Sequence, residues 1–168
     1  MKIAVVNSTE RGETDRLISQ TAAFLLAQGV KLTGIVKVLE DKEDPSCACD
    51  MAVRVLPEGL IIPITQDLGD GSDACKLDPG AIARAVNEVE KQSLEGVQMF
   101  ILNKFGPEEA AGRGFRAAIG AALEAGIPVL VGVGGPSRAA FDTFADGLAE
   151  TLPPDAGAIR NWCHGVMS

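Results

Sequence analysis

The stretch Ile3-Ala4-Val5-Val6-Asn7-Ser8-Thr9-Glu10-Arg11-Gly12-Glu13-Thr14 decides the fold that this sequence predicts. A short apolar run leads into a polar loop, and an amphipathic segment follows, which is the strand–loop–helix order of a phosphate-binding loop. Against the pattern G-x-x-x-x-G-K-[ST], Gly12 and Thr14 match, whereas Asn7 replaces the first glycine and Glu13 replaces the lysine. The stretch therefore predicts a phosphate-loop scaffold with the opposite charge at its key position.

The carboxylate at the lysine position opposes nucleotide binding. Two unit charges about 4 Å apart interact by about 4 kcal/mol at an effective dielectric of about 20, so a carboxylate repels a phosphate where lysine would attract it. We expect a nucleotide to be bound in some other way, or not at all. The loop residues that we retain as candidate ligand contacts are Ser8, Thr9, Arg11, Gly12 and Thr14.

Composition limits the class of protein. The chain has 168 residues, 46% apolar residues and a net charge of -8, which predicts one acidic α/β domain over residues 1–168 with a full hydrophobic core. A negative surface disfavours nucleic acid and anionic membranes as partners. No apolar run approaches the roughly 20 residues of a membrane span, and no signal peptide is apparent. We therefore expect a cytoplasmic protein with reduced cysteines.

Strands and helices alternate along the chain. The expected strands are 2–7, 31–38, 97–103 and 128–133, with a hairpin of 51–56 and 60–65 around the turn 57–59. The expected helices are 15–28, a helix from Asp78 as N-cap to about Leu94, 112–125, and a helix capped by Ser137 that carries Phe141, Phe144, Ala145 and Leu148. The tail after Pro154 is left unassigned.

This order predicts a three-layer α/β sandwich, a mainly parallel sheet flanked by helices with a β-hairpin excursion. Ligands of such sheets bind beyond the carboxyl ends of the strands. The loops 8–14, 104–113 and 134–137 should therefore meet at one edge of the sheet.

A second charge anomaly follows the strand 97–103. P-loop NTPases usually carry an acidic pair here, for Mg²⁺ and for the attacking water, but this chain has Asn103-Lys104. Both changes argue against Mg²⁺-dependent hydrolysis. Either Glu13 and Lys104 form an ion pair across the site, or Lys104 is free to hold an anion. The match of Asn103-Lys104 to the guanine-binding pattern Asn-Lys-x-Asp fails at Gly106, which replaces the carboxylate.

Further cations follow in the same loop. Arg113 and Arg116 are three residues apart and should share one face at the start of a helix, where they and Lys104 could hold a tetrahedral oxyanion. Gly106 would let the ligand approach the backbone. The alternative is a plain surface ion pair between Glu109 and Arg113.

Several segments together resemble a known family: Cys49-Asp50-Met51, Gln66-Asp67-Leu68-Gly69, Cys75-Lys76-Leu77-Asp78 and 103–116. The chain is similar to an uncharacterised bacterial family of unknown function, itself distantly similar to small P-loop nucleoside-triphosphatases and linked with molybdate transport and molybdenum metabolism. The resemblance implies a P-loop-like fold and a role with molybdate or tungstate. This chain departs from the family at Lys76, where arginine is usual, and in its glycine-poor first loop.

Cysteines and aspartates offer weaker candidates. Cys47, Cys49 and Cys75 are a candidate sulfur site for a soft metal, but C-x-C is not the usual zinc spacing, and plain thiols are the alternative. Cys163-His164 adds further ligand types. The aspartates at 67, 70, 73 and 78 lack the closing glutamate of a Ca²⁺ loop, so turns and caps explain them better.

Three functions stay open. The first is a non-hydrolytic oxyanion-binding protein for molybdate or tungstate storage, delivery or sensing, with molybdate-transport or molybdenum-enzyme proteins as partners. The second is a divergent nucleotide-binding protein or nucleoside-triphosphatase, although we expect nucleotide less than oxyanion. The third is an interaction module without a ligand. The sequence leaves the oligomeric state open, a homo-oligomer included.

Overall fold

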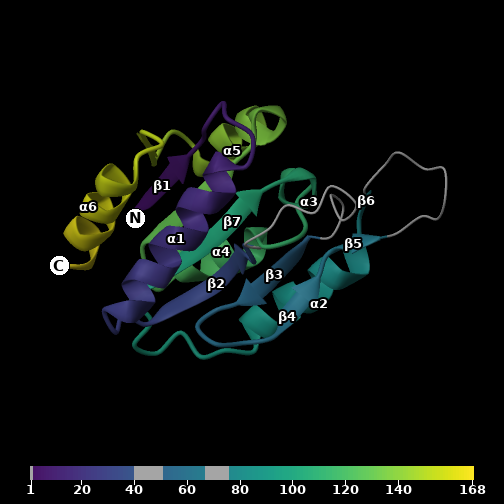
Figure 1. The fold of residues 1–168 in the computed structure, drawn as a ribbon, viewed down its shortest axis with the longest axis horizontal. Coiled ribbons are helices and arrows are strands. Elements are labelled where there is room, and N and C mark those ends of the chain that lie inside the picture. Colours follow the sequence, from purple (N-terminus) through teal and green to yellow (C-terminus); the bar gives the residue numbers. More distant parts are fainter. Residues whose placement is uncertain (1, 40–50, 67–75) are drawn as a thin grey trace.

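The computed structural model describes residues 2–39, 51–66 and 76–168. Within these ranges seven strands form one sheet in the order β4-β3-β2-β7-β8-β1-β9. The strands from β2 to β9 in this order pair in parallel, and β3 and β4 extend the sheet antiparallel from β2. Figure 1 shows the parallel strands with the hairpin at one side. The predicted mainly parallel sheet with a hairpin excursion is confirmed.

The bounds of the elements are as follows. The strands of the sheet are β1 (Ile3–Val6), β2 (Leu32–Lys37), β3 (Ala52–Val55), β4 (Ile61–Pro63), β7 (Met99–Phe105), β8 (Val129–Val133) and β9 (Ala149–Leu152). A separate short pair is formed by β5 (Thr65–Gln66) and β6 (Lys76–Leu77). The helices are α1 (Glu13–Ala27), α2 (Pro79–Glu90), α3 (Pro107–Ala110), α4 (Arg116–Glu124), α5 (Arg138–Ala145) and α6 (Ala156–Met167), and a 3-10 turn, η2 (Gly135–Ser137), precedes α5.

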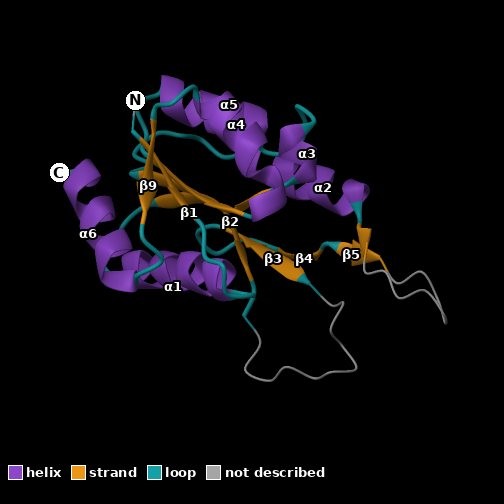
Figure 2. Cartoon of the chain, turned by 90° about the horizontal axis from the view of Figure 1, so that it is seen from above, coloured by secondary structure: helices purple, strands orange, loops and turns teal. Residues whose placement is uncertain are grey.

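Helices cover both faces of the sheet, as the period-two alternation of a strand requires. In β1, Ala4 and Val6 point to the face covered by α1 and α6, whereas Ile3 and Val5 pack with the residues of α2, α4 and α5. Figure 2 shows the sheet between these two groups of helices. Because β1 is buried on both sides, it reads as an uninterrupted apolar run. The predicted three-layer sandwich is confirmed.

Local signals in the sequence fix the ends of several helices. The carboxylate of Asp78 accepts the backbone N–H groups of Gly80 and Ala81, which confirms it as the N-cap of α2. Gly29 and Gly126 adopt left-handed conformations after α1 and α4, as C-terminal glycines do. Within the described ranges no helix combines the length and apolar character needed to cross a bilayer.

Other predicted boundaries are wrong. The expected helix 112–125 begins only at Arg116, because Gly112 and Gly114 take positive φ and a right-handed helix cannot pass through them. α2 ends at Glu90 instead of Leu94. Ser137 is the N-cap residue of α5, as the sequence predicted, but its side chain makes no capping hydrogen bond.

The sequence also misplaced the chain that follows α5. That helix ends at Ala145, because Asp146 is left-handed, so Leu148 lies outside it and is 55% exposed. Leu148 is followed by β9 (Ala149–Leu152), a strand that the sequence did not predict and that extends the sheet beyond β1. The unassigned tail after Pro154 forms α6, which is capped by Asp155.

Candidate functional site

The first loop, residues 7–12 between β1 and α1, folds back on itself. The Ser8 N–H donates to Oγ1 of Thr14 at 2.9 Å, and the Glu10 N–H donates to Oγ of Ser8 at 3.1 Å. Gly12 has φ of 77° and is the N-cap of α1. Thr9, Arg11 and Gly12 are exposed. In a working P-loop the hydroxyl at the position of Thr14 holds Mg²⁺. In this protein the same hydroxyl accepts a backbone N–H of its own loop.

The charge of this loop and its helix start is mostly negative. Glu13 and Asp15 occupy the first turn of α1, where carboxylates already complement the helix dipole. The pKa of Glu10 is raised, chiefly by its hydrogen bond to the Glu13 carboxyl and by the charge on that group. Glu13 also lies 4.0 Å from Arg16. An anion that approached this loop would meet a pair of neighbouring carboxyl groups.

Asn103 joins three elements at the edge of the sheet. Its Nδ2 donates to Oδ1 of Asp15 at 2.6 Å, and its Oδ1 accepts the Lys37 N–H at 2.9 Å. The Lys37 ammonium lies 3.6 Å from the other Asp15 oxygen. Because the amide is buried and hydrogen-bonded at both ends, Asn103 links the ends of β2 and β7 to the start of α1. These contacts give Asn103 a structural role, and its predicted role as a ligand contact stays a prediction.

The start of α1 lies very close to the sheet at Gly132. A Cβ atom at this position in β8 would overlap the backbone oxygen of Asn103 and lie 3.0 Å from Cγ2 of Thr14. Glycine is therefore required for the close approach of the backbones. The same contact brings the first loop and the end of β7 together, as the topology predicted.

Lys104 is exposed at the end of β7. Its side chain passes over Gly134, because a Cβ atom at Gly134 would lie 3.5 Å from Nζ of Lys104. Among the residues that the structure describes, Lys104 forms no ion pair. The hypothesis of a Glu13–Lys104 pair is therefore wrong, because the acidic loop folds toward its own helix and pairs with Arg16. The alternative, a lysine available to an anion, stays a prediction.

Glu109 is a buried carboxyl that organises the second loop. Its side chain is 5% exposed and accepts the N–H groups of Gly106 at 3.1 Å and of Phe115 at 3.4 Å. Burial raises its pKa, against the opposing effect of these hydrogen bonds. A Cβ at Gly114 would lie 2.6 Å from its Oε1, which explains a glycine there. Gly106 is buried and serves as the N-cap of α3, not as an open approach to the backbone.

The two arginines of this loop have separate partners. Nε of Arg113 donates to Glu108 at 2.9 Å, and this contact lowers the pKa of Glu108. The predicted alternative, an ion pair between Glu109 and Arg113, is therefore wrong, because the partner of Arg113 is the neighbouring residue Glu108. The guanidinium of Arg116 lies over the ring of Phe144, 5.1 Å from its centroid. The structure does not show these exposed arginines converging on Lys104.

The predicted sulfur site falls outside the part of the chain that the structure describes. Cys47, Cys49 and Cys75 lie outside the described residues, as do the aspartates at 67, 70 and 73. Cys163 is fully buried on α6, and burial raises the pKa of its thiol to about 12, so it stays protonated and unreactive. In the ranges covered by the structure no group of three or more His, Cys, Asp or Glu residues is arranged to hold a metal.

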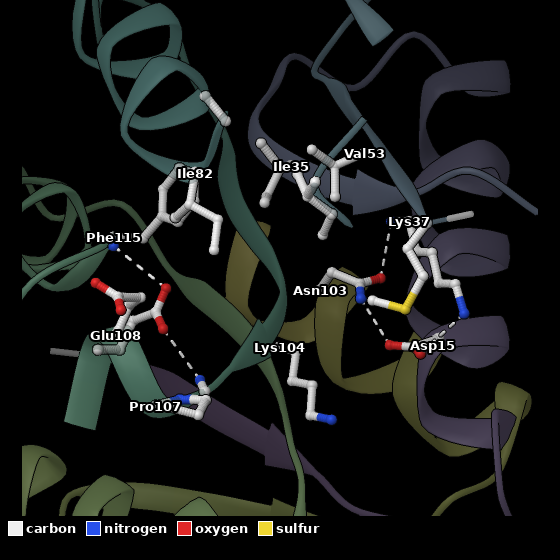
Figure 3. A pocket seen from close by; sticks show the side chains of 15 residues that line it. Asp15, Ile35, Lys37, Val53, Ile82, Asn103, Lys104, Pro107, Glu108 and Phe115 are labelled. Carbon is white, nitrogen blue, oxygen red and sulfur yellow. Dashed lines mark hydrogen bonds and ion pairs between the residues drawn. The ribbon is translucent and has the colours of Figure 1, made fainter. Parts of the chain in front are cut away.

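A cavity of about 180 Å³ opens beside these groups. Figure 3 shows Ile82 and Phe115 on one side of the cavity, Ile35 and Val53 on the other, and Asn103 and Lys104 below them. The lining residues come from α1, β2, β3, β7, α2 and the second loop: Asp15, Ile35, Lys37, Met51, Val53, Ile64, Ile82, Ala85, Asn103, Lys104, Gly106, Pro107, Glu108, Glu109 and Phe115.

Sequence reasoning missed Asp15, Lys37 and Glu109. Two signals were available. Lys37 is a charged residue at the carboxyl end of an apolar parallel strand, where ligand contacts gather. Glu109 stands three residues after Gly106, with Pro107 between them at the first helical position, which is the spacing of a helix start whose glutamate reaches back to the N-cap.

The fold and the loop between β1 and α1 define the class: an α/β protein with a P-loop NTPase-like scaffold. The chain belongs to the family DUF2478, described as a protein of unknown function, whose model matches residues 3–162. The predicted resemblance to such a family is confirmed.

One similar protein is named as part of a transport system. The chain is 34% identical over 167 residues to molybdenum import ATP-binding protein ModC 2 of Bradyrhizobium diazoefficiens. The match covers 99% of this chain but only 18% of that protein. Most of the relative therefore lies outside the match, and the ATP binding in its name need not reside in the part that this chain resembles.

A solved structure supports the fold. The solution structure of a human cancer-related nucleoside triphosphatase matches with a TM-score of 0.58, covering 99% of this chain and 94% of that one. At 13% sequence identity this likeness shows the architecture alone.

Proposed function

We propose that this chain is a non-hydrolytic oxyanion-binding protein on a P-loop NTPase-like scaffold, serving molybdate or tungstate storage, delivery or sensing. The observation that carries the proposal is Lys104, an exposed ammonium at the carboxyl end of a central strand with no ion-pair partner among the described residues. Parallel sheets bind ligands at this edge. The name of the molybdenum-import relative supports molybdate as the anion to test first.

Residues at the same edge of the sheet disfavour nucleotide hydrolysis. Glu13 occupies the position of the P-loop lysine, and Asn103, in β7 at the place of the acidic pair, is a buried amide already hydrogen-bonded to Asp15 and Lys37. Glu13 cannot neutralise a γ-phosphate as lysine does, and the Asn103 amide cannot hold Mg²⁺ as a carboxylate does. The exposed Arg113 and Arg116 could contribute only by exchanging their present contacts with Glu108 and Phe144.

Equilibrium titration tests the proposal. Molybdate, tungstate, sulfate and phosphate are added at constant ionic strength to the native protein, to Lys104→Ala and to the control Lys91→Ala, which removes an exposed lysine paired with Glu88. A charge-assisted hydrogen bond contributes about 1.5–3 kcal/mol, so Lys104→Ala should weaken binding by about 10- to 100-fold while the control does not. Absence of sub-millimolar binding to all four anions rejects the proposal.

A divergent nucleotide-binding protein or nucleoside-triphosphatase is the second candidate, favoured by the architecture shared with a nucleoside triphosphatase. It would use Arg11, Thr14 and Lys104 in new roles. Phosphate release from ATP and GTP with Mg²⁺ separates the two: turnover that Lys104→Ala abolishes would replace the oxyanion proposal with this one.

A further inference from the structure

The cavity beside Asn103 is separate from the first loop. Its walls come from β2, β3, β7 and α2 and from the second loop, and of α1 only Asp15 reaches it. Residues 7–14 do not line it. Its apolar lining residues Ile35, Val53 and Phe115 belong to the core on the face of the sheet covered by α2 and α4. α1 covers the other face (Figure 2). A ligand in this cavity would therefore contact a different surface from the one that a P-loop phosphate occupies.

The walls are suited to a flat apolar body. Ile82 and Phe115 face Ile35 and Val53 across the space, and Met51, Ile64 and Ala85 add further apolar surface (Figure 3). A volume of about 180 Å³ is below the roughly 300–1,000 Å³ of sites for drug-sized ligands. The space matches a small ring system between the two walls.

One edge of the cavity presents an acceptor next to a donor. The Asp15 carboxylate and the Lys37 ammonium are 3.6 Å apart, with side chains 22% and 28% exposed. This separation is longer than a hydrogen bond, so the ammonium keeps its donors, and a carboxylate has about four acceptor sites of which Asn103 uses one. A ligand with an N–H beside a C=O is complementary to this pair.

The charges of the rim nearly cancel. Lys37 compensates Asp15, and Arg113 compensates Glu108. The Glu109 carboxyl is buried and already accepts the N–H groups of Gly106 and Phe115. Of the cationic residues that line the cavity, only Lys104 has no ion-pair partner among the described residues. An uncharged ligand is therefore better matched to the interior than a dianion such as molybdate, which would bring two charges among apolar walls.

We propose that this cavity is a second binding site, for a small, flat, uncharged heterocycle with an adjacent N–H and C=O, a cyclic amide. The ring lies between the walls formed by Ile82 and Phe115 and by Ile35 and Val53. The N–H donates to the Asp15 carboxylate, and the carbonyl accepts from the Lys37 ammonium. Lys104 lies at the edge of this cavity, but the proposed contacts of the cyclic amide do not use it.

The probe for the test is quinazolinone, a flat bicyclic lactam, and its matched control is the N-methyl derivative, which keeps the ring and loses the donor. Methyl NMR spectra follow both titrations. Saturable shifts of the Ile35, Val53 and Ile82 methyl groups are expected with quinazolinone, with binding about tenfold weaker or more for the N-methyl compound, because the Asp15 carboxylate then lacks its donor. Equal binding of both compounds, or no saturable shift, overturns the proposal.

Two variants locate the probe. Asp15→Asn keeps the shape and an acceptor for Asn103 but removes the charge, and it should weaken quinazolinone binding several-fold; Glu124→Gln, on the exposed side of α4, is the matched control. Ile82→Trp fills the cavity from a half-buried position of α2 and should abolish binding. Retained binding in Ile82→Trp places the probe elsewhere and contradicts the proposal.

Molybdate separates this site from the oxyanion site, although Lys104 lines the cavity, because Lys104 takes no part in binding the cyclic amide. Ile82→Trp should lose quinazolinone binding and keep molybdate binding, whereas Lys104→Ala should lose molybdate binding and keep quinazolinone binding. If the native protein binds no molybdate but quinazolinone behaves as expected, the proposed function fails and the cavity site stands. Loss of both ligands in both variants would mean one shared site and would overturn the assignment of a second one.

Discussion

The loop after β1 and the loop after β7 occupy equivalent places at one edge of the sheet, yet they differ in charge. The first carries the neighbouring carboxyls of Glu10 and Glu13 and folds back through the Ser8–Thr14 hydrogen bond. The second begins with Lys104, which has no ion-pair partner in the described ranges. A shared scaffold position therefore does not fix which loop can attract an anion, because local charge decides it.

The two loops meet at Asn103, so the largest effect should come from breaking this junction. Asn103→Ala leaves the Lys37 N–H and the Asp15 carboxylate without their partner, and an unsatisfied buried group costs about 1–3 kcal/mol. Urea unfolding should show a loss of this size. Asn87→Ala, on the exposed side of α2, is the control, and a loss no larger than that of the control would show that the junction is dispensable.

Adjacent carboxyls of the second loop should titrate in opposite directions. Burial raises the pKa of Glu109 above 4.5, whereas the hydrogen bond from Arg113 lowers that of Glu108 below 4.5. Carboxyl NMR signals followed across the acidic range measure both values. Identical titration of the two groups would contradict the buried position of Glu109.

These directions have opposite consequences for stability. Between 4.5 and the raised pKa of Glu109, the folded protein binds more protons than the unfolded chain, so this group's contribution to stability falls as pH rises through that window. The contribution of Glu108 is present above 4.5 and is lost as pH falls through its lowered pKa. Glu109→Gln should remove the first dependence, as measured by unfolding free energy against pH.

The smallest effect is expected from the arginines of the second loop. Arg113 is 66% exposed in its pair with Glu108, and exposed pairs contribute about 0–1 kcal/mol. Arg113→Ala should change the unfolding free energy by less than about 1 kcal/mol. It should lower molybdate affinity much less than Lys104→Ala does. A loss of affinity equal to that of Lys104→Ala would support the anion-binding group of Lys104, Arg113 and Arg116 that the sequence predicted.

The sequence predicted the layers well because uninterrupted apolar runs such as Val129–Val133 mark strands buried on both faces. It failed where short-range geometry overrides helical pattern. The Ala-rich run after Gly112 was assigned to one helix, but positive φ at Gly112 and Gly114 delays the helix to Arg116. The edge strand β9 alternates little and was missed, because its exposed Glu150 and Thr151 resemble a loop.

The candidate site was less predictable than the fold. Strand order placed the first loop near the end of β7, which required only topology. Partners between distant segments could not be read from spacing: Asp15 and Asn103 are 88 residues apart, and Lys37 is 66 residues from Asn103. The sequence therefore named Asn103 and Lys104 together as ligand contacts, whereas the structure buries the first and exposes the second.

We infer that the loop after β7, and not the loop after β1, attracts the anion. Calorimetric titration of molybdate into the native protein, Lys104→Ala and Glu13→Ala at one ionic strength distinguishes the two loops. We predict that Lys104→Ala loses most of the affinity and that Glu13→Ala binds at least as tightly as the native protein, because a nearby negative charge has been removed. Loss of binding in Glu13→Ala with full binding in Lys104→Ala would contradict the claim.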